Sequence, residues 1–337
     1  MVSQALTWDS DWLSYIAATR VEKQKPTPIF GDWMGKPDPT GLYAGIYYQF
    51  SNWTDFSDVI QVPRTDALLF VDDNKKRRLY LMQSNGSEQW GDPPQTLLLK
   101  NDIRLYDPEA LTTDNREFVY ICTSHCHKKK KPQPAWKKPR VHVFVRFRLD
   151  DRGRLMPDGL ITNLCEMLCV QYEFIRRVAH LGPKKGGINI EGLAYDSRNG
   201  RLLIGLRSPL YDERACLIPV GIDPNQPFVS ENLTWGEPLA LQIPNKGVRS
   251  IQYDERLDAF LILAGNVRKG TGADFALWLW DGNPEGRCRR VDAVRFRDYF
   301  NPEGVSRVSL STGEDYIFIV SDNGGGYMKL RYEELNL

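Results

Sequence analysis

The chain repeats one pattern, in which a polar opening is followed by an apolar run, a polar turn and a second apolar run. Two copies are the plainest, "NIEGLAYDSRNGRLLIGLRS" at residues 189–208 and "NPEGVSRVSLSTGEDYIFIVSDN" at residues 301–323. Three further segments align with them, at residues 56–74, 107–125 and 247–266. Internal repetition on this scale indicates a repeat architecture, and it constrains the fold more than any other feature of the sequence.

The second apolar run of each copy has the composition of a buried strand. The runs "ALLFV", "FVYIC", "RLLIGL", "AFLILA" and "YIFIV" are rich in branched and aromatic residues and are bounded by turn-forming residues. A third β-prone run follows each of them, and a fourth follows in most copies. Antiparallel units of four strands, repeated in series, are typical of a β-propeller. We therefore predict an all-β fold with five blades.

The longest interval between copies separates Glu109 from Glu191 and leaves a sixth blade open as an alternative. It contains a basic stretch, "HKKKKPQPAWKKPR", and then "NLCEMLCVQYEFIRRVAHLG", whose apolar residues recur at helical spacing and which ends at Gly182. A helical insertion near residues 163–181 is the simpler interpretation. A degenerate sixth blade in this interval is the other.

The last copy supplies only three strands before the sequence ends at Leu337. The run "GLYAGIYYQF" at residues 41–50 belongs to no complete blade, so we expect it to pair with the last blade and close the ring. Closure of this kind removes two exposed sheet edges, which are otherwise prone to aggregation. We expect residues 1–40 to form a lead-in segment and residues 41–337 to form a single propeller domain.

Composition bears on the cellular setting and on the partners. Apolar residues make up 42% of the chain, charged residues 26%, and the net charge is +1, which argues against a protein that coats nucleic acid or an anionic membrane. No apolar run is long enough to cross a bilayer, and the N-terminal residues do not resemble a secretory signal. The six cysteines are few and fit a reducing compartment. These features predict a cytoplasmic protein.

Strand alternation in a propeller brings the start of the first strand and the end of the second to the same face, near the axis. Two circles of polar residues follow from this rule. The first contains Asp58, Glu109, Glu191, Arg249 and Glu303. The second contains Asp72 or Asp73, His125, Arg207, Asn266, and Asp322 or Asn323. We predict that these side chains meet at one mouth of the ring.

Crowded carboxylates raise one another's pKa or require a cation, and hard oxygen ligands suit Ca²⁺ or Mg²⁺. The predicted metal ligands are Asp58, Glu109, Glu191, Glu303 and Asp322. Arg207 and Arg249 would either neutralise the ring or hold a carboxylate or phosphate of a ligand. The alternative is structural, because polar residues at loop starts also cap turns and bridge blades.

Two functions are consistent with this pattern. In the first, the mouth binds a small polar or phosphorylated ligand through a divalent cation and supports phosphoester or ester hydrolysis. Glu191 and Glu303 would then orient metal or water, His125 would carry the proton, and Arg207 and Arg249 would stabilise negative charge. In the second, the protein is a scaffold that binds a protein or polyanion through its disc face and its Lys-rich loop. The sequence does not decide whether the protein is an enzyme.

Two other stretches received competing interpretations. The basic run Lys128–Lys131, with Trp136 nearby, could bind single-stranded nucleic acid or another polyanion, although such runs are usually solvated loops. "CTSHCH" at residues 122–127 offers soft metal ligands, and Cys165 and Cys169 would have to complete a zinc site. Cys122 lies in an apolar run, which favours a core thiol. The sequence contains no nucleophile elbow, phosphate loop, dinucleotide fingerprint or HExxH motif.

The stretches "GINIEGLAYDSRNGRLLIGLRSPL" and "ACLIPV" resemble the family catalogued as domain of unknown function 3616, and "FSDVIQVPRTDALLFVDDN" resembles an earlier segment of it. The resemblance extends over residues 41–337 and is centred on Glu191, Gly192, Leu206 and Arg207. A wider similarity to phytase-like and esterase-like propellers implies an acidic mouth that binds Ca²⁺ and acts on phosphate esters. The nearer family has no settled activity. Asp58 and Arg249 depart from its Glu-Gly pattern, which favours an asymmetric pocket.

Overall fold

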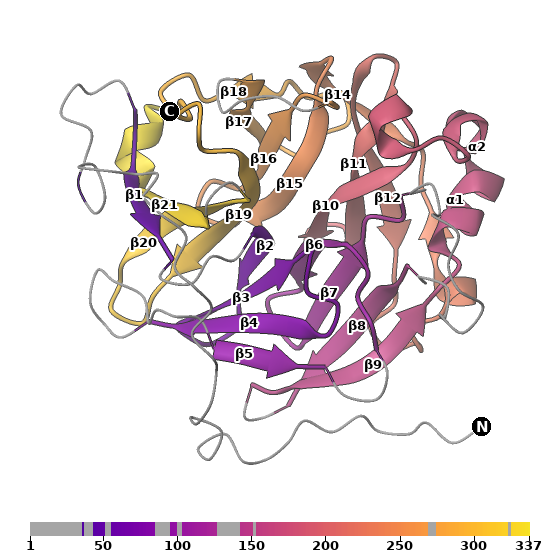
Figure 1. The fold of residues 1–337 in the computed structure, drawn as a ribbon, viewed down its shortest axis with the longest axis horizontal. Helices are drawn as coiled ribbons and strands as arrows, with labels where there is room; N and C mark the ends of the chain where they lie inside the picture. The colour runs from indigo at the N-terminus through magenta and orange to yellow at the C-terminus, as the bar shows by residue number, and fades with distance from the viewer. Residues whose placement is uncertain are drawn as a thin grey trace.

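The computed structural model describes residues 36, 43–50, 55–84, 95–99, 103–126, 142–150, 153–268, 274–322 and 325–337. These residues form a five-bladed β-propeller, as the repeats predicted (Figure 1). The expected lead-in segment falls almost entirely on residues that are not described. No helix in the described part of the chain is both long and apolar enough to cross a membrane.

Blades 1 and 2 are four-stranded antiparallel sheets with the strands in chain order. Blade 1 consists of β2 (Phe56–Gln61), β3 (Ala67–Asp72), β4 (Arg78–Gln83) and β5 (Gln95–Leu98). Blade 2 consists of β6 (Pro108–Thr113), β7 (Phe118–Thr123), β8 (Phe144–Leu149) and β9 (Leu155–Ile161). The outer strand β9 was not expected from the sequence.

Blades 3 and 4 differ from the others at their outer edges. Blade 3 consists of β10 (Asn189–Asp196), β11 (Arg201–Tyr211), β12 (Arg214–Gly221), β13 (Thr234–Trp235) and β14 (Leu239–Pro244). Both β13 and β14 pair with β12, at opposite ends of it. Blade 4 consists of β15 (Gly247–Asp254), β16 (Ala259–Gly265), β17 (Ala276–Trp280) and a two-residue β18 (Arg289–Arg290).

Blade 5 closes the ring with a strand from the other end of the sequence. It consists of β19 (Pro302–Ser309), β20 (Asp315–Ser321), β21 (Gly326–Leu330) and β1 (Ile46–Gln49). The pairing of β1 with β21 confirms the predicted closure. The 3-10 helix η5 (Tyr332–Leu335) reinforces it, because Glu334 Oε1 accepts a hydrogen bond from the Gly45 amide at 2.9 Å.

The long interval between blades 2 and 3 contains helices rather than a sixth blade. Residues 162–188 are all described and contain α1 (Leu164–Gln171), α2 (Glu173–Val178) and the 3-10 helix η2 (Pro183–Lys185). Leu164, Leu168 and Ile175 are buried in the apolar core between blades 2 and 3. The helical insertion was therefore predicted correctly, and the six-bladed alternative was wrong.

The hydrophobic core is divided among the five junctions between neighbouring blades. Between blades 5 and 1, for example, Phe56 stacks on Phe70 with ring centroids 4.5 Å apart, and Phe70 meets Phe318 of blade 5 at 6.1 Å. The first strands of the blades, β2, β6, β10, β15 and β19, surround the axis (Figure 1). Consequently, each inner strand offers one of its ends to each face of the disc.

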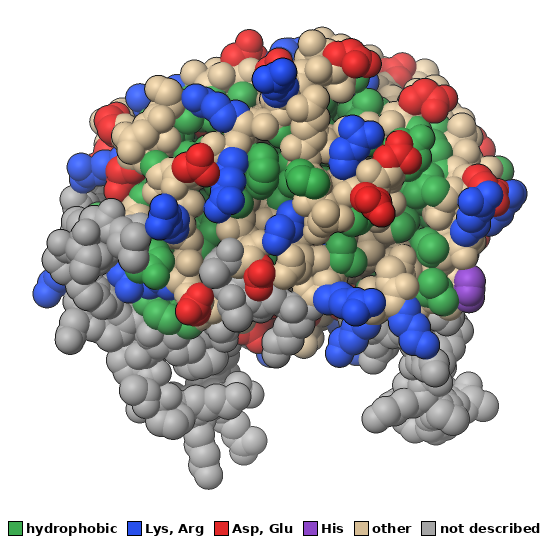
Figure 2. All heavy atoms as spheres, turned by 90° about the horizontal axis from the view of Figure 1, so that it is seen from above, with side chains coloured by type: hydrophobic (Ala, Val, Ile, Leu, Met, Phe, Trp, Pro, Cys, Tyr) green, Lys and Arg blue, Asp and Glu red, His purple; other side chains and the backbone are tan. Residues whose placement is uncertain are grey.

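Figure 2 looks onto the rim of this disc and shows Lys and Arg side chains interspersed with Asp and Glu. On this face, charges of both signs are mixed, as is usual for a globular protein, and no large patch of a single sign is visible. Buried charged residues of the inner strands, by contrast, lie near the axis.

Candidate functional site at the mouth of the propeller

Every inner strand has an irregular register at the same point, close to its first residue. In blade 3, Ile190 faces Leu206 and Gly192 faces Gly205, so Glu191 is the extra residue of a β-bulge. The equivalent extra residues of the five blades are Ser57, Glu109, Glu191, Arg249 and Glu303. Sequence alignment had assigned Asp58 to this circle, one residue too far, because a bulge leaves no direct signal in sequence.

Glycine follows the bulge in blades 3 and 5 because the inner strands approach closely there. A Cβ at Gly192 would lie 2.7 Å from a methyl carbon of Val248 in blade 4. A Cβ at Gly304 would lie 2.6 Å from the Cα of Asp58 in blade 1. In the Glu-Gly pair of the repeat, the glutamate is therefore the bulged residue, and the glycine leaves room for the neighbouring inner strand.

We use the term mouth for the end of the axis where the inner strands begin. Among the described residues, its charged groups include Asp73, Asp107, Glu109, Glu191, Arg207, Arg249, Glu303 and Asp322. Four of them form a continuous chain of ion pairs across blades 3, 4 and 5. Arg249 contacts Glu191 Oε2 at 2.9 Å through one terminal nitrogen and pairs with Glu303 through the other. Arg207 continues the chain, because its NH1 donates to Glu191 Oε1 at 2.8 Å.

The two arginines differ in accessibility. The Arg249 side chain is 6% exposed and lies between two carboxylates, whereas the Arg207 side chain is 22% exposed. Arg207 Nε also donates to the carbonyl of Val267 at 3.2 Å, and Asn189 donates its amide to Glu191 Oε1 at 2.6 Å. Sequence reasoning correctly placed Glu191, Arg207, Arg249 and Glu303 together.

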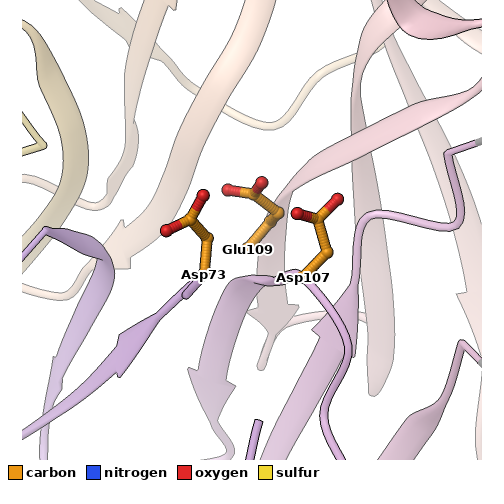
Figure 3. A group of neighbouring side chains, drawn as sticks. All are labelled: Asp73, Asp107 and Glu109. Atoms are coloured by element: carbon orange, nitrogen blue, oxygen red, sulfur yellow. The ribbon is translucent and has the colours of Figure 1, made fainter. Parts of the chain in front are cut away.

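A second group, which we call the acidic cluster, consists of Asp73, Asp107 and Glu109. Each offers a carboxylate oxygen, and these oxygens all lie within 4.8 Å of one another. Asp73 directly follows β3, Asp107 precedes β6 and Glu109 lies in β6, and the three side chains project into one space (Figure 3). Hard oxygen donors at this separation fit a divalent cation, with water or ligand oxygens completing its coordination.

Electrostatics joins the acidic cluster to the arginines. Burial raises the pKa of Glu109 well above its usual value, and the neighbouring Glu191, Asp107 and Asp73 raise it further. Burial also raises the pKa of Asp322, which Arg249 partly offsets. Among the described residues, at least six carboxylates and two guanidiniums therefore share one mouth, and this crowding of carboxylates favours a cation.

Sequence reasoning missed Asp107. Its carboxylate accepts hydrogen bonds from Ser124 Oγ at 2.5 Å and from Cys126 Sγ at 3.3 Å, and its backbone has a positive φ of 64°. An Asp before a Pro is typical of a turn, so nothing in its local sequence separates a ligand from a turn residue. The available signal was its spacing, two residues before the bulged Glu109.

Asp58 lies one layer deeper than the mouth and has no exposure to it. Its Oδ2 accepts a hydrogen bond from the Leu111 amide of blade 2 at 2.7 Å, and its Oδ1 accepts one from Ser250 Oγ of blade 4 at 3.0 Å. Burial raises the pKa of Asp58 well above its usual value, which these donors partly oppose. Asp58 thus links three blades across the axis and is not part of the acidic cluster.

The remaining predicted residues lie near the mouth but in different settings. His125 is buried, its ring centroid is 5.4 Å from that of His142, and burial together with His142 lowers its pKa to about 3. Asn266 accepts a hydrogen bond from Lys246 Nζ at 2.6 Å. Burial raises the pKa of Asp72 to about 6. The alternative Asn323 has no described position.

The opposite end of the axis, which we call the turn end, is closed by polar contacts between blades. Thr112 of blade 2 bonds to Gln252 of blade 4 at 3.4 Å, and Asn115 of blade 2 donates to Glu255 of blade 4 at 3.3 Å. Arg307 of blade 5 also contacts Glu255, at 3.2 Å. These contacts tie blades 2, 4 and 5 together at the turn end.

Two other sequence features were considered as sites, the cysteine–histidine pattern at residues 122–127 and the basic stretch that follows it. Within the described ranges, the acidic cluster is the one group of three or more potential metal ligands, so the cysteine and histidine pattern does not assemble there. Cys122 is buried in the core of blade 2, and burial raises its pKa. The basic stretch at residues 127–140 is outside the part of the chain that the structure describes.

Comparison with known proteins gives a match to one family model and distant similarities to solved structures. Residues 153–315 match the family model described as a protein of unknown function, DUF3616. No curated protein matches the chain. Solved structures that it resembles include a gluconolactonase from Xanthomonas campestris, at 10% identity and a TM-score of 0.43, covering 85% of this chain and 89% of that one.

Two further solved structures are similar at the same low level. A nidogen/laminin complex matches at 9% identity and a TM-score of 0.38, covering 84% of this chain and 82% of that one. Sqt1 of Saccharomyces cerevisiae matches at 9% identity and a TM-score of 0.33, covering 86% of this chain and 98% of that one.

Proposed function

We propose that this chain, which belongs through residues 153–315 to the DUF3616 family, binds a divalent cation at the mouth of its propeller and, through that cation, a small polar ligand. The observation that carries the proposal is the acidic cluster, in which Asp73, Asp107 and Glu109 bring three carboxylate oxygens within 4.8 Å of one another. Ca²⁺ and Mg²⁺ are the cations that such a donor set suits.

The surroundings of the cluster favour a bound cation over a purely structural group. The mouth has more carboxylates than arginines, and the pKa of Glu109 is raised by burial and then by neighbouring carboxylates. Glu191 and Glu303 are occupied by Arg207 and Arg249, so these two carboxylates position the arginines rather than the cation. The ligands we assign are accordingly Asp73, Asp107 and Glu109.

Hydrolysis of a phosphoester or ester is the reaction class that this arrangement supports best. A bound divalent cation would polarise the ester and lower the pKa of a bound water. Arg207 would stabilise negative charge as it develops. His125 contributes little as a proton carrier near neutral pH, because its pKa of about 3 leaves it a weak base.

Calorimetric titration of the purified protein with Ca²⁺, Mg²⁺ and Mn²⁺ tests cation binding. We expect one ion per chain, with loss of binding in Asp107→Asn and Glu109→Gln. A saturating cation at 100 times its Kd should also stabilise the fold by about 2.7 kcal/mol. Glu285→Gln, which changes an exposed carboxylate away from the mouth, is the matched control and should bind as the wild type does.

A screen of phosphoesters and lactones with each cation then tests the reaction. Turnover that requires the cation and disappears in Glu109→Gln would support a hydrolase. Failure of all three cations to bind, or unchanged binding in Asp107→Asn and Glu109→Gln, would contradict the proposed function.

A further inference from the structure

The two arginines of the mouth present different surfaces to an incoming molecule. Arg249 has a carboxylate at each terminal nitrogen and is 6% exposed, so its guanidinium is already paired within the protein. Arg207 is 22% exposed and uses NH1 for Glu191 and Nε for the Val267 carbonyl. Among the described residues, none bonds to its second terminal nitrogen, NH2.

Arg207 is also held in place before any ligand arrives. Glu191 fixes one side of the guanidinium at 2.8 Å, and Val267 fixes the Nε edge at 3.2 Å. Its backbone packs so closely on Gly247 of blade 4 that a side chain at Gly247 would collide with it. A guanidinium restrained in this way loses little conformational freedom when it binds an oxyanion.

The position of Arg207 relates it to the acidic cluster. Arg207 bonds to Glu191, and the neighbouring Ile190 amide donates to the Ser124 carbonyl at 2.9 Å. The Ser124 hydroxyl in turn donates to Asp107 of the acidic cluster at 2.5 Å, so Arg207 and the proposed cation site lie at the same mouth. Without a cation, the surplus of carboxylates would repel an anion. With a cation present, an anion could share its oxygens between the metal and the open NH2 of Arg207.

We propose that the ligand of this mouth is a small oxyanion, a phosphate monoester or a carboxylate, and that Arg207 is the residue that selects it. This inference rests on the proposed function, because the oxyanion binds only once the cation is in place. The coupling must be reciprocal, so that the oxyanion also tightens cation binding by the same factor.

The experiment titrates inorganic phosphate, and separately acetate, into the full-length protein with and without saturating Mg²⁺. We expect phosphate or acetate to bind in the presence of Mg²⁺ only. Arg207→Gln should weaken that binding at least about tenfold, as loss of a charge-assisted hydrogen bond does, while Mg²⁺ binding alone persists. Whichever anion binds more tightly identifies the ligand as phosphate-like or carboxylate-like.

Two further variants separate selection from folding. Arg207→Lys retains the charge and should keep part of the anion affinity, whereas Arg198→Gln removes an arginine at the turn end of the same blade and should leave both affinities unchanged. If Mg²⁺ fails to bind the wild type, the proposed function fails and the inference falls with it. If Mg²⁺ binds but neither anion does, or Arg207→Gln binds anions as the wild type does, the inference alone is overturned.

Discussion

The two ends of the propeller axis treat charge differently. At the turn end, buried carboxylates accept hydrogen bonds from the backbone of their own turns. Asp114 accepts three, from the amides of Arg116, Glu117 and Phe118, and Asp254 accepts two from its own turn and one from the Tyr332 hydroxyl. At the mouth, the buried charges are satisfied by side chains of other blades, as in the chain from Arg207 through Glu191 and Arg249 to Glu303.

This difference separates folding from function. A carboxylate that caps its own turn stabilises a local structure that every blade needs. Ionisable groups buried against one another cost desolvation, and an apolar filling of the same space is often as stable. The mouth has therefore retained charges that folding alone does not require, which is the pattern expected of a binding site.

The largest effect is expected from Arg249→Met. This substitution leaves Glu191 and Glu303 without their shared cation, and breaking a buried pair costs about 3–5 kcal/mol of folding free energy. Urea denaturation would measure the loss. Addition of Glu303→Gln to Arg249→Met should recover part of it, and no recovery would mean that lost packing rather than uncompensated charge is responsible.

For Asp58→Ala we expect a somewhat smaller loss of folding free energy, about 3 kcal/mol. The Leu111 amide and the Ser250 hydroxyl would lose their buried acceptor, and a cavity would form on the axis. The comparison is Asp114→Ala at the turn end, where we expect about 1–2 kcal/mol. Denaturation of both variants under the same conditions would check the order. A larger loss at Asp114 would show that cross-blade ties matter less than local turns.

The pH dependence of Asp58→Asn relative to the wild type gives a smaller but more specific test. Burial raises the pKa of Asp58 in the folded state above its unfolded value of about 3.9, so folding favours the protonated form. The stabilisation is complete below about pH 4 and is lost as the pH rises toward the raised pKa. The asparagine variant, which does not titrate, should therefore gain stability relative to the wild type between pH 4 and pH 7. A difference that stays constant across this range would rule out a buried, titrating Asp58.

The smallest effect is expected from Arg256→Met at the turn end. Arg256 is 42% exposed and pairs with Asp315 at 3.4 Å, and exposed pairs contribute about 0–1 kcal/mol. Its guanidinium also stacks over Tyr332 at 4.1 Å, which the methionine partly replaces. Thermal denaturation should show a shift near the limit of measurement. A loss as large as that of Arg249→Met would remove the distinction between the two ends.

Much of the fold could be predicted from the sequence because its signals are local. The β-prone runs and turns identified five blades, and the unpartnered run at residues 41–50 predicted the closing strand that pairs with β21. The short outer strands were harder to predict from the sequence. The outer strand β18 of blade 4 has only two residues, and the outer strand β9 of blade 2 was not recognised.

The mouth was predictable only in part. Glu191, Arg249 and Glu303 follow from the repeat and meet as expected. Asp58 was placed in the wrong layer, because the bulge that aligns Ser57 with Glu109 is a property of strand register and not of residue type. Asp107 was missed because its role depends on its approach to Asp73, which belongs to a neighbouring blade.

The central claim concerns the acidic cluster, and an anomalous difference map from crystals of the protein soaked in Mn²⁺ tests it most directly. We predict a single strong peak among Asp73, Asp107 and Glu109, absent from crystals of Asp107→Asn. A map without a peak there at saturating Mn²⁺, or one with its strongest peak at another place on the protein, would contradict the account.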